Sequence, residues 1–89
     1  MPEPFTIYGA THCDDTQHAR ELLAAWNLPD PYINIDHDPR AEAFVIFINA
    51  GNRSTPTLVF GAGRHKIILT EPSDGEFKAA LLQAGYLLE

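Results

Sequence analysis

The order of apolar patterns in the first half of the chain constrains the fold more than any other feature. Residues 5–8 are β-branched or aromatic and end at a glycine, which predicts a strand. A helical run from residue 17 to 26 follows, and residues 32–35 predict a second strand. The apolar face of the helical run has the spacing i, i+3, i+4 and i+7, at Ala19, Leu22, Leu23 and Trp26. Such a strand–helix–strand unit makes its two strands parallel, with a right-handed crossover.

The second half of the chain predicts a helix, a hairpin and a last helix. Asp38-Pro39 is typical of a helix start, and residues 50–52 of its end. Residues 57–60 and 66–69 flank a glycine-rich turn, which predicts an antiparallel hairpin. Ser73 and Glu76 have the spacing of a capping box before a helix that stops near Gly85. The apolar faces of the two helices are Ala41, Phe44, Val45 and Ile48, and Phe77, Ala80, Leu81 and Ala84.

The resulting order is β-α-β-α-β-β-α. It predicts an α/β fold in which a four-stranded mixed sheet has helices on both faces. With 89 residues, of which 45% are apolar, the chain can bury one core, so we expect a single domain over residues 1–89.

Charge and composition exclude several classes of partner. The net charge is −6 and the basic residues form no stripe, so we expect no nucleic-acid partner. No apolar run is long enough for a membrane span, and the N-terminus lacks a signal pattern, so we expect no membrane association. The single cysteine rules out an internal disulfide and suits a reducing compartment, which predicts a cytoplasmic protein.

That cysteine, Cys13, lies where the first strand gives way to a helix. Amide N–H groups and the helix dipole favour a negative charge at such a junction, and a thiol placed there can become a nucleophilic thiolate. The alternative is a small buried apolar side chain, which is the usual role of a lone cysteine.

The chain resembles the thioredoxin fold, and within it the glutaredoxins, particularly the short bacterial glutaredoxin-like or mycoredoxin-like group. The resemblance is carried by Thr6-Ile7-Tyr8 before Cys13, by residues 49–60 (Asn-Ala-Gly-Asn-Arg-Ser-Thr-Pro-Thr-Leu-Val-Phe) and by residues 70–73 (Thr-Glu-Pro-Ser). It implies a cis peptide bond between Thr55 and Pro56, with the backbone there facing the cysteine.

The chain departs from the family where a second cysteine is usual. The motif reads Cys13-Asp14-Asp15-Thr16, so Thr16 stands at the position of the resolving cysteine. A dithiol mechanism is therefore excluded, and a monothiol exchange through Cys13 remains. Thr16 is a candidate hydrogen-bond donor to the sulfur.

The charges around Cys13 have opposing effects on its ionisation. Asp14 and Asp15 disfavour a thiolate, whereas the helix start and a protonated His12 favour it. The sequence leaves the balance open.

The resemblance also implies a site for a low-molecular-weight thiol of the glutathione or mycothiol type. Thr55 and Pro56 would pair with its cysteinyl part, Ser73 and Asp74 would hold its γ-glutamyl end, and Arg53 would pair with a carboxylate. Each residue also has a simpler interpretation: a residue before a structural proline for Thr55, a helix cap for Ser73 and Asp74, and a solvated loop side chain for Arg53.

A metal site is the weaker interpretation of the side chains near Cys13. His12, Cys13, Asp14 and His18 offer the ligand types of zinc or iron, with Asp14 and His18 on one helix face. Their spacing matches no established site, so we expect no metal. His37 and His65 are most simply surface residues.

Two functions fit these residues. The first is a monothiol oxidoreductase that reduces mixed disulfides between proteins and small thiols. The second is a catalytically weak or inactive binding module that uses the groove between Cys13 and Pro56.

An oligomer is also expected. Ile46 points away from the apolar stripe of the second helix and Phe47 lies near the edge of that stripe. With Ala43 and Ala50 they would form a second apolar patch. Pairing of this patch about a two-fold axis predicts a homodimer. The alternative is that Phe47 folds over the sheet edge and Ile46 stands alone.

Overall fold

The structure, a computed structural model, describes residues 1–88. Its elements follow the predicted order, with one additional 3-10 turn in the hairpin. They are β1 (Phe5–Gly9), α1 (Asp14–Ala25), β2 (Tyr32–Asn34), α2 (Pro39–Ile48), β3 (Thr57–Phe60), η1 (Gly63–His65), β4 (Ile67–Thr70) and α3 (Asp74–Gln83).

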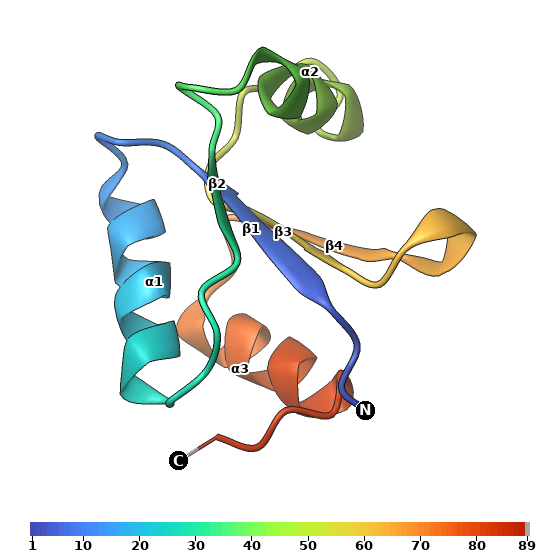
Figure 1. Cartoon of the computed structure of the whole chain (residues 1–89). Helices are drawn as coiled ribbons and strands as arrows, with labels where there is room; N and C mark the ends of the chain where they lie inside the picture. The colour runs from blue at the N-terminus through green and yellow to red at the C-terminus, as the bar shows by residue number, and fades with distance from the viewer. Residues whose placement is uncertain (89) are drawn as a thin grey trace.

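The four strands form one mixed sheet in the order β2-β1-β3-β4. β1 and β2 are parallel, and β3 is antiparallel to both β1 and β4. Figure 1 shows α2 over one face of this sheet and α1 and α3 over the other. The predicted α/β architecture is therefore confirmed as a thioredoxin-like fold.

The core lies on both faces of the sheet, with the larger cluster on the face that α1 and α3 cover. Leu58 and Phe60 face α1 and α3, where they pack with the buried Leu23 and Phe77. All four residues of β3 are buried, because helices cover both faces of this central strand. On the α2 face a smaller cluster forms from Ile35, Ala41 and Val45.

Local chemistry explains where the helices begin. The Asp38 carboxylate accepts a hydrogen bond from the Ala41 amide, with Pro39 at the first helical position. At α3 the Ser73 hydroxyl and the Glu76 carboxylate complete the predicted capping box. These contacts satisfy amides that the first helical turn leaves unpaired.

Some element bounds differ from the sequence prediction by a few residues. α1 begins at Asp14, ahead of the apolar run at residues 17–26, and Asp14 and Asp15 lie in its first turn, as expected from their favourable interaction with the helix dipole. β2 ends at Asn34, one residue early, and β4 covers Ile67–Thr70 rather than residues 66–69. Among the described helices, none combines the length and apolarity needed to cross a bilayer.

Candidate active site

Cys13 occupies the N-cap position of α1. Its backbone is extended, with φ −106° and ψ 111°, and its carbonyl accepts the first helical hydrogen bond, from Gln17 at 3.1 Å. The side chain is half-buried. The thiol therefore takes the place at the helix start that a capping serine or aspartate usually fills.

The thiol faces the segment that precedes β3. Cys13 Sγ donates to the carbonyl oxygen of Thr55 at 3.4 Å. The peptide bond between Thr55 and Pro56 is cis. Two loops that are 42 positions apart in the sequence thus meet at the sulfur.

Thr16 lies one helical turn beyond Cys13 and is fully buried. Its hydroxyl oxygen accepts a hydrogen bond from the Ala10 amide at 3.4 Å and donates to the Cys13 sulfur. A side chain at Gly9 would collide with Thr16, so the glycine that ends β1 makes this close packing possible. Thr16 is therefore held in place from the strand side and presents its hydroxyl to the thiol.

The balance of effects on the Cys13 thiol favours ionisation. Partial burial raises the pKa of the thiol. Hydrogen bonds from the Thr16 and Thr55 side chains and from the amides of Thr16 and Asp15 lower it by more than burial raises it, so the net pKa lies below the ordinary value. The neutral thiol forms no cap hydrogen bond with the helix, because it is a weak acceptor. The thiolate is a stronger acceptor for the Thr16 hydroxyl and the first-turn amides.

A network that the sequence did not reveal joins the two loops around Cys13. The Asp36 carboxylate accepts from the Thr11 amide at 2.9 Å and from the Arg53 guanidinium at 2.6 Å. Arg53 also donates to Glu42 on α2, at 2.6 Å. Arg53, expected to bind a ligand carboxylate, is therefore already paired with two carboxylates of its own chain. The sequence signal for this network is weak: it consists of Arg53 as a charged residue in its loop.

The start of α3 holds a second pair that the sequence did not reveal. His18 Nε2 lies 2.9 Å and 3.1 Å from the two carboxylate oxygens of Asp74, with both side chains more than half exposed. The Ser73 amide donates to Glu76 at 2.9 Å. Asp74 and Ser73, expected to hold a small thiol, thus have partners within the protein.

A groove of about 440 Å³ connects several of the expected site residues. Asp15, His18 and Pro56 line one part of it, and Ser73 and Asp74 line another. Cys13 does not line it, but its sulfur contacts Thr55, the residue before the groove residue Pro56. The structure therefore brings Cys13, Thr16, Thr55, Pro56, Ser73 and Asp74 to one region, whereas Arg53 is held by its network and the His12 side chain is exposed.

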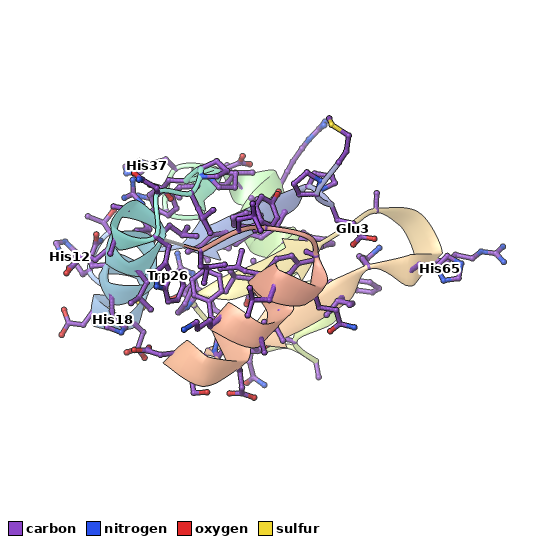
Figure 2. All side chains as sticks on the ribbon, turned by 90° about the horizontal axis from the view of Figure 1, so that it is seen from below. Glu3, His12, His18, Trp26, His37 and His65 are labelled. Atoms are coloured by element: carbon purple, nitrogen blue, oxygen red, sulfur yellow. The ribbon has the colours of Figure 1, made fainter. Side chains whose placement is uncertain are left out.

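The histidines do not gather at one site. Figure 2 shows His12 and His18 on the side of α1 and His65 at the far end of the molecule, on the β3–β4 hairpin. Over residues 1–88, no three His, Cys, Asp or Glu side chains are placed to hold a metal ion together.

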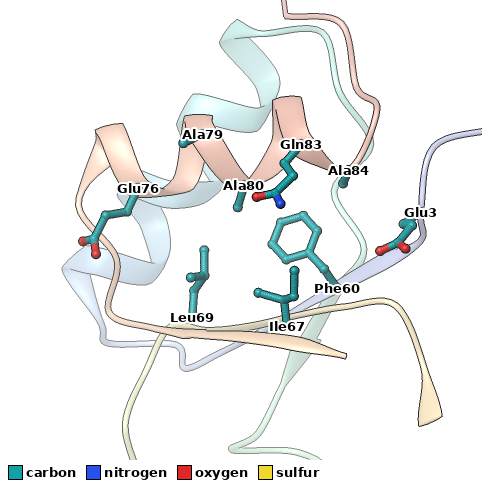
Figure 3. Close-up of a pocket in the computed structure, with 9 residues that line it drawn as sticks. All are labelled: Glu3, Phe60, Ile67, Leu69, Glu76, Ala79, Ala80, Gln83 and Ala84. Carbon is teal, nitrogen blue, oxygen red and sulfur yellow. The ribbon is translucent and has the colours of Figure 1, made fainter. Parts of the chain in front are cut away.

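A second cavity, of about 420 Å³, lies between α3 and the β3–β4 side of the sheet. Figure 3 shows Phe60, Ile67 and Leu69 beneath α3, with Glu76 and Glu3 at the two ends. Its lining is mostly apolar and contains no thiol or hydroxyl group, so we do not place the candidate active site there.

Comparison with known proteins agrees with this geometry. No family model matches the chain. Two curated proteins do, named "Putative glutaredoxin MT3292" and "Putative glutaredoxin Rv3198A", from two strains of Mycobacterium tuberculosis. Each is 35% identical over 78 residues, which cover 88% of this chain and 89% of the relative. With this similarity and a thioredoxin-like fold that places a cysteine at the start of α1, the chain belongs to the glutaredoxin family.

Proposed function

We propose that the protein is a monothiol oxidoreductase that reduces mixed disulfides between proteins and a small thiol through Cys13. One observation carries the proposal: the Cys13 sulfur sits at the N-cap of α1, 3.4 Å from the carbonyl oxygen of Thr55 and beside the cis bond to Pro56. The Thr16 hydroxyl and first-turn amides there lower the pKa of the thiol. A half-buried thiol with this environment is a good nucleophile and a good leaving group in exchange.

The reaction proceeds by two thiol–disulfide exchanges. The Cys13 thiolate attacks the small-thiol sulfur of the mixed disulfide, forming a new disulfide with that thiol and releasing the protein thiolate. A second small thiolate then attacks the sulfur that is bound to Cys13. Cys13 leaves as a thiolate and the two small thiols leave as their symmetrical disulfide, so the second thiol supplies the reducing electrons.

The surrounding residues would act on the thiol and on its partner. Thr16 stabilises the thiolate, and the backbone at Thr55 and Pro56 aligns the disulfide. Ser73 and Asp74 contact the far end of the small thiol, which is of the glutathione or mycothiol type, and His12 and Arg53 border the site. No metal takes part, and the free thiol suits a cytoplasmic location.

The test uses a carrier protein that bears one S-thiolated cysteine, with excess of the matching small thiol. Wild-type protein should accelerate release of the carrier thiol, followed by mass spectrometry, and Cys13→Ser should not, because the chain has no second thiol. Acceleration by Cys13→Ser equal to that of the wild type would overturn the proposal.

A binding module remains the second candidate, and one observation favours it. The groups expected to hold the small thiol, Arg53, Ser73 and Asp74, are already paired within the protein. If the wild type gives no acceleration with any S-thiolated carrier, the groove beside Pro56 would instead serve protein binding without exchange.

A further inference from the structure

We propose that the groove next to the Cys13 site selects its small thiol by charge, so that thiols without a carboxylate are favoured over the glutathione type, which carries two. The inference rests on the proposed function, because it concerns the thiol that forms a disulfide with Cys13. It depends on three features of the groove: the charges of its lining, the partners of its anion-binding groups and the His18–Asp74 pair.

The lining of the groove is acidic. Its charged and titratable side chains are four carboxylates and one imidazole, and no lysine or arginine is among the residues that line it: Asp15, His18, Glu71, Asp74 and Glu76. The hydrogen bonds from Ser73 hold the pKa of Glu76 below its usual range, so this carboxylate is charged at neutral pH. A ligand that brings a further negative charge into the groove would be repelled.

The groups that would neutralise a ligand carboxylate are used within the protein. The Ser73 amide donates to Glu76 at 2.9 Å, so a side-chain carboxylate already occupies this part of the α3 start. The Arg53 guanidinium donates to Asp36 and to Glu42, each at 2.6 Å. An anionic thiol would have to displace one of these carboxylates, whereas an uncharged thiol would not.

The His18–Asp74 pair offers a place where a cationic ligand could bind. Both side chains are more than half exposed, so solvent and ligands reach them. A ligand ammonium could replace His18 as the partner of Asp74, but a ligand carboxylate would face the Asp74 oxygens directly. The expected order of preference is therefore cationic, then uncharged, then anionic.

The experiment measures how fast Cys13 reacts with methanethiosulfonates that differ in charge. The probes carry a trimethylammonioethyl, a methyl or a sulfonatoethyl group. The thiolate attacks the sulfenyl sulfur, forms a mixed disulfide and releases methanesulfinate. Each rate, followed by mass spectrometry at low salt, is divided by that of 2-mercaptoethanol with the same reagent. We expect the corrected rates to fall from cation to anion by about tenfold or more. At 1 M salt, where the Debye length is about 3 Å, the difference should nearly vanish.

Matched variants locate the effect. Asp74→Asn and Glu71→Gln should each reduce the cation-to-anion ratio. Glu21→Gln changes the net charge equally at an exposed position of α1 outside the groove, and it should leave the ratio close to that of the wild type.

Equal corrected rates for the cation and the anion would overturn the inference. So would a groove variant that behaves like Glu21→Gln. The probes react with any accessible thiol, so they report charge selection whether or not the protein catalyses exchange. Failure of the proposed function would appear separately, in the S-thiolated carrier assay.

Discussion

The Arg53 guanidinium and the Asp36 carboxylate meet at 2.6 Å, and Asp36 belongs to the loop between β2 and α2. Asp36 also accepts a hydrogen bond from the Thr11 amide, two residues before Cys13. Asp36 thus links the loop that supplies Cys13 to the loop that supplies Thr55, through contacts outside the groove.

The first prediction concerns the pH dependence of this pair. Hydrogen bonds from the Thr11 amide and from Arg53 lower the pKa of Asp36 to about 2, from an ordinary value of 3.8. Because the charged form is favoured in the folded state, its stabilisation is present above pH 4 and is lost as the pH falls towards 2. Urea unfolding at pH 6 should show Asp36→Asn less stable than the wild type, and the difference should shrink towards pH 2. A difference independent of pH would contradict the assignment.

The second prediction concerns the Thr16 hydroxyl. Thr16→Val removes the hydrogen bond that lowers the Cys13 pKa, so the midpoint of the rate of iodoacetamide alkylation against pH should move upward. It also leaves the buried Ala10 amide without its partner, at a cost of about 1–3 kcal/mol of unfolding free energy. Thr16→Ser keeps the hydroxyl and should retain the wild-type midpoint. A midpoint that Thr16→Val leaves unchanged would remove Thr16 from the site.

The third prediction concerns conversion to a dithiol. The Thr16 side chain hydrogen-bonds the Cys13 sulfur, so a thiol at position 16 would lie next to it. Thr16→Cys should therefore form an internal disulfide under mild oxidation, seen as the loss of two hydrogens by mass spectrometry. Persistence of two free thiols in glutathione redox buffers across the oxidising range would show that the helix start does not allow the bond.

The fourth prediction concerns the homodimer, which the structure of a single chain does not test. Phe47 is 83% exposed on α2, beside the exposed Ala43 and Ala50, while Ile46 is half-buried. Sedimentation equilibrium at micromolar concentration should show a dimer for the wild type and a folded monomer for Phe47→Lys. Leu82→Lys replaces an exposed apolar residue on α3 and should leave the dimer intact. A wild type that stays monomeric at high concentration would exclude this pairing.

Periodicity and capping residues were sufficient to predict the fold. β3 was predicted at its observed bounds, and Asp38 and Ser73 cap their helices as expected. These signals are local, because each depends on residues within one turn or one strand.

The polar contacts of the site were much less predictable. The sequence identified Cys13, but not that Arg53 binds Asp36 or that His18 binds Asp74, 56 positions away. Ion pairs between exposed side chains depend on how loops approach one another in three dimensions, and apolar periodicity carries no information about that. For this reason, the prediction that Arg53 and Asp74 contact a ligand did not include their partners within the chain.

The packing of Gly9 against Thr16 has a consequence for how such a site can change over evolutionary time. Threonine and cysteine occupy similar volumes, so the space at position 16 accepts either one. Serine is smaller than both, and single-base changes connect its codons to those of threonine and to those of cysteine. A lineage could therefore gain or lose a second thiol here without rebuilding the end of β1. Position 9 has no such freedom, because a side chain there would collide with the Thr16 side chain and would also approach the Tyr32 ring. The glycine is thus expected to persist through changes of redox chemistry that replace its neighbour.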